Sequence, residues 1–126
     1  MIESFKDLVV YQKAFEHAMK IFHLTKKFPK AEQFALTDQI GRSSRSICAN
    51  LAESWRKRRY PAHFVSKLSD ADAEASETVV WLDFALQCGY LLPEVHRQLE
   101  SEYEQIGKML GSMISAPEKF CYVVKK

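Results

Sequence analysis

Six basic side chains gather in one part of the sequence, where they could bind a polyanion. They are Arg42, Arg45, Arg56, Lys57, Arg58 and Arg59. On a helix with about 100° per residue, one face carries small alanines, no acid and four of the five arginines, namely Arg42, Arg45, Arg56 and Arg59. Planar guanidinium groups donate paired hydrogen bonds to phosphate oxygens, so this pattern predicts a nucleic-acid-binding surface. The alternative is an ordinary solvated helix end, because cations there are favoured by the helix dipole.

A second polar group follows the shoulder of the same predicted helix. Its members are Gln39, Ser46, Asn50 and Glu53. A half-buried amide or carboxylate needs hydrogen-bond partners, and Glu53 could pair with Lys57 one turn later or with a neighbouring helix or subunit. A single carboxylate without a second group is poor support for acid–base catalysis. We therefore expect this strip to be structural.

Patterns that bind metals, phosphates or cofactors are missing from the sequence. No Glu-x-x-His pair of a di-iron bundle, no HExxH, no CxxC and no Gly-rich phosphate loop occurs. The histidines His17, His23, His63 and His96 are scattered, and we expect them at the surface or at its boundary with the core rather than on a metal. The sequence thus predicts no catalytic residue, no metal, no cofactor and no enzyme.

Cysteine usage and hydropathy predict a cytoplasmic protein. Cys48, Cys88 and Cys121 are odd in number and widely spaced, which favours free thiols in a reducing compartment. No signal-peptide pattern is present, and the longest apolar run contains Asp83 and Gln87 and is too short to span a bilayer. We expect no membrane partner.

The charge is distributed unevenly. Residues 1–63 hold 12 Lys and Arg against 6 Asp and Glu, whereas residues 64–126 hold 6 against 10. A basic half can bind a polyanion, but it can equally attract the acidic half within the fold or between subunits. Both interpretations remain open from charge alone.

Four segments with helical periodicity predict an all-α fold. We expect helices at about 7–27, 33–58, 62–88 and 93–115, with a C-terminal tail over 116–126 that shows no clear pattern. The apolar stripe expected in the first helix consists of Leu8, Tyr11, Phe15, Ala18, Phe22 and Thr25. Short connectors join the segments, and Gly89 is placed to end the third helix. The prediction is one domain over residues 1–126, an antiparallel up-down-up-down four-helix bundle.

The third predicted helix is apolar on more than one face. Val80, Trp81 and Phe84 point away from the stripe that contains Leu68 and Leu82. One bundle covers only one face of a helix, so we expect these three residues in the interface of a homo-oligomer. A central helix buried within the bundle is the alternative.

Three stretches resemble one bacterial family. They are "FKDLVVYQKA", "FPKAEQFALTDQIGRSSRSICANLAES" and "GYL", in order from Phe5 to about Leu91. The chain resembles the four-helix bundle family of the 23S rRNA intervening sequence proteins, also called the S23 family. Ser54 departs from the family pattern, which usually has Gly there.

The resemblance implies a bundle that assembles into a ring, most often a homopentamer, without an established activity. Related accessory variability proteins of diversity-generating retroelements are basic pentamers that bind nucleic acid and a reverse transcriptase. The residues that match the family's polar pattern are Gln39, Arg42, Ser46, Asn50 and Glu53.

Together these patterns lead to one functional prediction and one alternative. We predict a non-enzymatic, oligomeric helical scaffold that binds RNA or DNA through its basic face, with phosphate contacts dominating. The alternative is a protein-interaction module that docks an acidic partner, such as a nucleic-acid-associated protein, and has no nucleic-acid role of its own.

Overall fold

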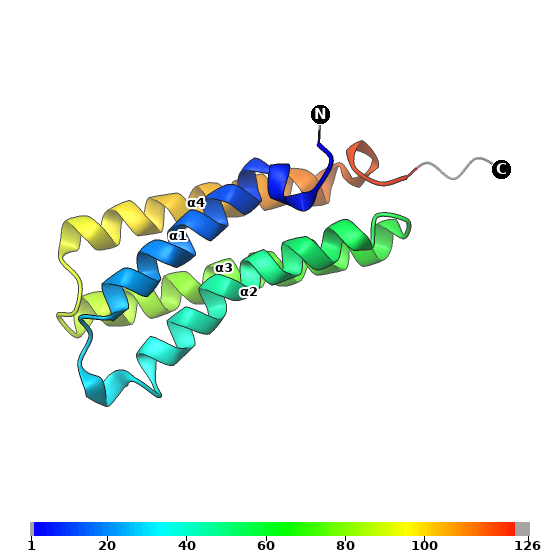
Figure 1. The fold of residues 1–126 in the computed structure, drawn as a ribbon. Helices are drawn as coiled ribbons and strands as arrows, with labels where there is room; N and C mark the ends of the chain where they lie inside the picture. Colours follow the sequence, from blue (N-terminus) through cyan, green and yellow to red (C-terminus); the bar gives the residue numbers. More distant parts are fainter. Residues whose placement is uncertain (1, 123–126) are drawn as a thin grey trace.

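The computed structural model describes residues 2–122, which form an all-α bundle (Figure 1). The long helices are α1 (Val9–Thr25), α2 (Leu36–Arg56), α3 (Pro61–Gln87) and α4 (Pro93–Ser115). Three short 3-10 turns, η1 (Phe5–Asp7), η2 (Lys30–Glu32) and η3 (Pro117–Lys119), accompany them. The predicted fold class is confirmed, and the described residues contain no strand.

The four helices surround one core. Helix α1 packs against α2 and α4, and α3 also packs against α2 and α4, so α1 and α3 are diagonal to each other. Each helix runs antiparallel to its neighbours, and η1 and η3 lie at the end of the bundle that carries the α2–α3 turn (Figure 1). The largest fully buried side chains are Ile21, Ile40, Ile47, Leu51, Phe64, Leu68, Leu82, Leu99, Tyr103, Ile106 and Leu110.

Helix α1 is rotated relative to the predicted stripe. Its buried residues are Val10, Ala14, His17, Ala18 and Ile21. Phe15 and Phe22 were predicted to be in the core, yet they are 52% and 37% exposed. The prediction was wrong because apolar residues cover more than half of this helix, so periodicity alone did not select the buried side.

Helix boundaries differ from the predictions where 3-10 turns and loops intervene. Helix α2 begins at Leu36, because η2 ends at Glu32 and the Glu32 carboxylate accepts a hydrogen bond from the Leu36 amide (3.3 Å). It ends at Arg56, and residues 57–59 form a turn. Helix α3 starts with Pro61, which is tolerated in a first turn, and is followed by Gly89 at φ 80°, a left-handed conformation that glycine adopts without strain.

Small polar residues let α2 and α3 pack closely. Ser43, Ser44 and Ser54 of α2 are buried. Ser54 donates a hydrogen bond to the Leu51 carbonyl (2.7 Å), so its hydroxyl is satisfied inside the helix that carries it. A serine therefore fits the position where the family pattern expects glycine.

Part of the predicted tail is structured. Phe120, which follows η3, packs against Trp55 and Phe64 with ring centroids 6.5 and 6.1 Å apart. Residues 123–126 of that tail lie outside the described residues. None of the described helices combines the length and the apolar character that crossing a membrane would require.

Candidate nucleic-acid interface

Three arginines form a stripe along the outer side of α2. Arg42, Arg45 and Arg56 are exposed, and the positions between them on this side include Ala49 and Ala52. At about 1.5 Å per residue, the stripe extends over about 21 Å, the length of about six phosphates of one strand of a duplex. Side chains at these positions can therefore contact one nucleic-acid backbone together.

The α2 stripe contains an acid, contrary to prediction. Arg42 Nε donates a hydrogen bond to Asp38 Oδ2 at 2.9 Å, one helical turn away. Asp38 is at the N-terminal end of α2 and shares the face with Arg42 and Arg45. The Arg42 side chain is still 77% exposed, so its terminal nitrogens face solvent.

A groove between α1 and α2 joins the α2 stripe to an aromatic ring. We call it the basic groove; its volume is about 370 Å³, and its lining includes Phe22, Lys26, Asp38, Gly41, Arg42 and Arg45. Lys26 Nζ lies 4.6 Å from the centroid of the Phe22 ring, and Arg45 Cζ lies 5.8 Å from it. Cations on an aromatic face are attracted by its quadrupole. The sequence prediction missed Phe22 and Lys26 here, although their spacing of four residues on one helix places them side by side.

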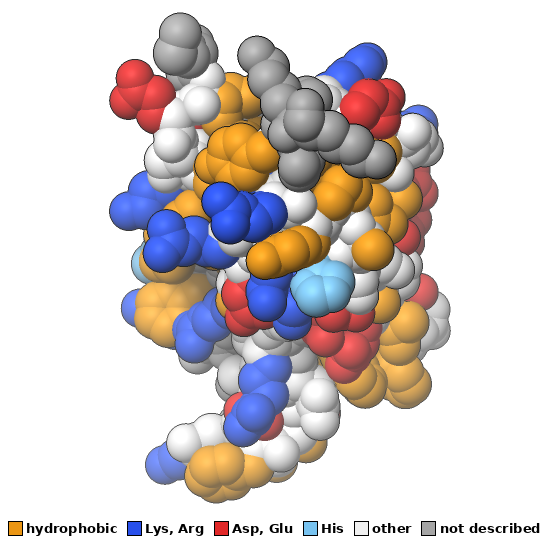
Figure 2. Space-filling view, turned by 90° about the vertical axis from the view of Figure 1, so that its right-hand side faces the viewer, with side chains coloured by type: hydrophobic (Ala, Val, Ile, Leu, Met, Phe, Trp, Pro, Cys, Tyr) orange, Lys and Arg blue, Asp and Glu red, His pale blue; other side chains and the backbone are white. Residues whose placement is uncertain are grey.

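The consecutive basic residues 56–59 do not act as a unit. Only Arg56 belongs to α2, and the next three residues form the turn toward α3. Figure 2 looks onto this end of the bundle, where Lys and Arg side chains gather on the left of the view. Arg56, Lys57 and Arg59 are exposed, whereas Arg58 is half-buried.

Arg58 is held by aromatic side chains. Its guanidinium carbon lies 3.7 Å from the centroid of the Trp55 ring and 4.8 Å from that of Tyr122. Arg58 also donates hydrogen bonds to the Trp55 carbonyl (2.8 Å) and to the Tyr122 hydroxyl (3.0 Å). These contacts occupy Arg58 within the fold, so it is the least available of the six predicted residues for a phosphate.

Only two members of the predicted polar strip, Asn50 and Ser46, are joined to each other by hydrogen bonds. Asn50 donates from Nδ2 to the Ser46 carbonyl (3.0 Å) and to the Ser46 hydroxyl (3.1 Å). Glu53 pairs with Lys67 of α3 at 2.8 Å rather than with Lys57. Its hydrogen bond and charge raise the pKa of Lys67 above the ordinary value. Gln39 is exposed and stands apart from these contacts.

The predicted interface residues of α3 lie at the surface. Val80 and Phe84, one turn apart, are 46% and 55% exposed, and Trp81 is half-buried with its ring 5.9 Å from that of Phe84. Trp81 Nε1 donates to a carboxylate oxygen of Glu77 (3.3 Å). These positions could be covered by another subunit, and their role in an interface stays a prediction.

The acidic half of the chain leaves most of the basic face free. Lys13 of α1 pairs with Glu102 of α4, and Glu53 pairs with Lys67. Within residues 2–122, however, no ion pair reaches Arg45, Arg56, Lys57 or Arg59. The acids in the second half of the chain therefore do not neutralise these four cations through ion pairs within one chain.

Known proteins place the chain in a family. No curated protein matches it. A solved structure from Bacteroides thetaiotaomicron, described as a protein of unknown function from the S23 ribosomal protein family, matches with a TM-score of 0.77 and 33% identity, covering 87% of this chain and 98% of that one. The description of that structure mentions no enzyme, and the description of the family mentions none either. The family model for the 23S rRNA-intervening sequence protein matches residues 6–112, and the chain therefore belongs to the 23S rRNA-intervening sequence protein family.

Proposed function

We propose that this protein is a non-enzymatic helical scaffold that binds structured RNA through the basic groove, the α2 stripe and the exposed Lys57 and Arg59 of the turn that follows α2. The observation that carries the proposal is the basic groove itself, where Lys26 and Arg45 lie over the exposed ring of Phe22 and Arg42 lines the same groove. The family's description, which names an intervening sequence of 23S rRNA, makes RNA the first nucleic acid to test.

The groove offers two kinds of contact that suit RNA. The Arg45 guanidinium, which makes no ion pair within residues 2–122, and the exposed part of the Arg42 side chain can bind phosphate oxygens, and this contributes affinity without sequence preference. An aromatic face can stack on an unpaired base, and Phe22 is 37% exposed, so a stacked base would displace the Lys26 or Arg45 side chain that lies over the ring. RNA with single-stranded loops next to a duplex therefore suits the surface better than a uniform duplex.

We further propose that the scaffold is a homo-oligomer, with a ring as the expected form. Closing a ring needs two different surfaces on each chain. Apolar side chains are exposed on two diagonal helices, Phe15 and Met19 on α1 and Val80 and Phe84 on α3. The uneven charge of the two halves of the chain also favours contact between unlike surfaces. A symmetric dimer would use only one of these surfaces.

RNA binding can be tested with a charge-matched pair of variants. Fluorescence anisotropy of a labelled hairpin from a 23S rRNA intervening region would be measured between 50 and 200 mM salt. We expect Arg45→Ala/Arg56→Ala to lower affinity about tenfold or more and to reduce the slope against log salt by about 1.5, because two phosphate contacts are lost. The control Arg97→Ala/Lys108→Ala removes the same charge from exposed positions on α4, across the bundle, and should bind as the wild type does.

Two results would contradict RNA binding. One is an absence of binding by the wild type at low salt, and the other is an equal loss in both double variants. The alternative, an acidic protein partner, is favoured by exposed apolar residues, above all Phe34, which precedes α2 and is 88% exposed. Nuclease-resistant capture of one stoichiometric protein, lost in Phe34→Ser, would support that alternative.

A further inference from the structure

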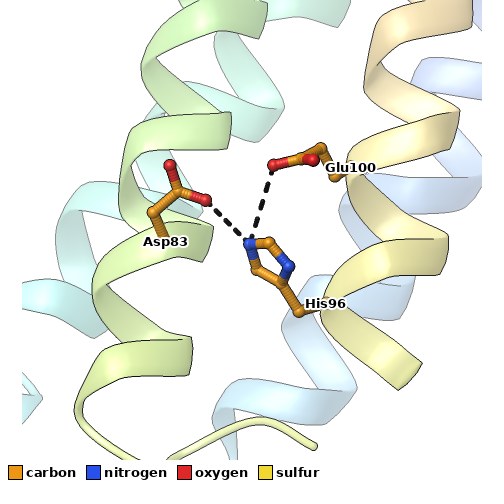
Figure 3. Close-up of side chains that lie close together, drawn as sticks. All are labelled: Asp83, His96 and Glu100. Carbon is orange, nitrogen blue, oxygen red and sulfur yellow. Dashed lines mark hydrogen bonds and ion pairs between the residues drawn. The ribbon is translucent and has the colours of Figure 1, made fainter. Parts of the chain in front are cut away.

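Three side chains from α3 and α4 converge at the surface near the turn that joins these helices. Asp83 comes from the C-terminal part of α3, and His96 and Glu100 lie one turn apart at the start of α4 (Figure 3). This group contains neither a Glu-x-x-His nor an HExxH spacing, so it does not follow from the metal-binding patterns considered in the sequence. His96 and Glu100 are in the spacing His-x-x-x-Glu, and the third residue comes from another helix.

Both carboxylates approach the same nitrogen of His96. Asp83 Oδ1 lies 2.7 Å from His96 Nε2, and Glu100 Oε2 lies 3.8 Å from it. All three atoms lie within 4.8 Å of one another. An Nε2–H group can donate a good hydrogen bond to only one of these oxygens, and a Glu100 oxygen at 3.8 Å is beyond hydrogen-bond range. An Nε2–H group on His96 can therefore satisfy Asp83 alone, and Glu100 receives no direct hydrogen bond from the ring.

A divalent transition-metal ion can bind His96 and both carboxylates at once, which a proton on His96 cannot. Zinc binds imidazole nitrogen and carboxylate oxygen at about 2.0–2.2 Å, so two ligands of one ion lie about 3–3.5 Å apart. The separations of 2.7 and 3.8 Å bracket that range, and small side-chain rotations would equalise them. We propose that Asp83, His96 and Glu100 form a site for a divalent transition-metal ion of the zinc type, with water completing the coordination.

The surroundings set the character of the site. The His96 side chain is only 12% exposed, whereas Glu100 and Asp83 are 37% and 57% exposed. The imidazole is thus held against the bundle, while the carboxylate side opens to solvent and lets an ion enter and leave. Imidazole is a poor ligand for Mg²⁺ and Ca²⁺, so these ions should not compete. A bound ion would tie α3 to α4 beside their connecting turn.

Zinc titration followed by calorimetry tests the site. Untagged protein should bind one Zn²⁺ per chain, and the same protein should show no comparable heat with Mg²⁺. His96→Ala and Glu100→Gln should each weaken Zn²⁺ binding at least tenfold. Glu100→Gln keeps the size of an exposed side chain and so remains informative if His96→Ala folds poorly.

Two controls separate this site from other zinc ligands. His23→Ala removes an exposed histidine on α1, and Cys88→Ser removes the exposed thiol in the α3–α4 turn. Both should bind Zn²⁺ as tightly as the wild type does. The proposal is overturned if the wild type binds no Zn²⁺, if His96→Ala and Glu100→Gln bind it unchanged, or if a control variant loses it. RNA binding does not involve these residues, so the two proposals fail independently.

Discussion

The Thr78 hydroxyl donates a hydrogen bond to the Ser43 hydroxyl at 2.8 Å, and both residues are buried between α2 and α3. This is a polar contact inside a packed helix pair. The Ser43 hydroxyl in turn donates a hydrogen bond to the Ile40 carbonyl at 3.4 Å. Thr78 Oγ1 also lies 2.9 Å from the Glu74 carbonyl, so each hydroxyl has an acceptor in its own helix, and sliding one helix past the other would cost the contact between the two hydroxyls.

Replacing Thr78 with valine should therefore destabilise the fold. Valine has the shape of threonine, so the cost comes from the lost hydrogen bond and from the buried Ser43 oxygen, which loses its donor. We expect a loss of about 1–2 kcal/mol in the free energy of unfolding. Urea denaturation followed by circular dichroism measures it. Ser76→Ala, at an exposed position on α3, is the control and should change stability by less than about 0.5 kcal/mol. Equal effects in the two variants would show that the Thr78 contact contributes nothing.

Alkaline conditions should weaken the fold. Burial raises the pKa of the Cys48 thiol from 9.0 to about 11, and burial also raises the pKa of Tyr103. Because these groups hold their protons more tightly when folded, the unfolded chain loses them first, and stability present below about pH 9 is lost as pH rises toward 11. The urea concentration at the midpoint of unfolding should decrease as the pH is raised from 8.5 to 10.5.

A cysteine variant isolates part of that alkaline effect. Cys48→Ala removes one of the raised groups, so its urea midpoint should fall less between pH 8.5 and 10.5 than that of the wild type. Cys88→Ser changes an exposed thiol and should keep the wild-type pH dependence. A midpoint that is independent of pH in the wild type would contradict the assigned cause.

Alanine variants of Arg58 and Arg59 should show that the first residue contributes to the stability of the fold and the second to RNA binding. Arg58→Ala removes the contacts with Trp55 and Tyr122, so we expect a loss of about 1–2 kcal/mol in unfolding free energy and little change in RNA affinity. Arg59→Ala should leave stability within about 0.5 kcal/mol and reduce the salt slope of RNA binding by about 0.7–0.9. Thermal melts and anisotropy titrations on the two proteins measure both quantities. The reverse pattern would mean that Arg58, not Arg59, contacts the phosphates.

A charge on the outer face of α3 should break the proposed oligomer. Phe84→Glu is the better variant than Trp81→Glu, because Trp81 is half-buried against the core and its loss would also disturb the fold. We expect Phe84→Glu to shift the mass seen by light scattering toward that of one chain while helical content stays the same. Ser101→Glu, exposed on α4, should keep the wild-type mass. An unchanged mass for Phe84→Glu would remove this face from the interface.

Periodicity and breakers were enough to predict the bundle and its approximate helices. Pro61, Gly89 and Pro93 mark helix ends in both sequence and structure, because each restricts the backbone locally. The rotation of α1 was not predictable, since Phe15 and Phe22 make its exposed side as apolar as its buried side.

Contacts between helices account for the remaining differences. The pairing of Glu53 with Lys67 and the meeting of Asp83 with His96 both depend on the register of one helix against the next. Register follows from side-chain packing along the whole interface, which no local pattern reveals. The pairing of Arg42 with Asp38 is different, because its spacing of four residues was visible in the sequence.

The shortness of the α2–α3 turn bears on how the chain folds. Only residues 57–60 separate two helices of 21 and 27 residues. Closing so short a loop costs little conformational entropy, and it brings together a long packed pair whose contacts are local along the chain. Helices α1 and α4, by contrast, meet only when nearly the whole chain is in place. The α2–α3 hairpin is therefore the natural folding nucleus, and destabilising changes within it should slow folding, whereas changes in α1 should mainly speed unfolding.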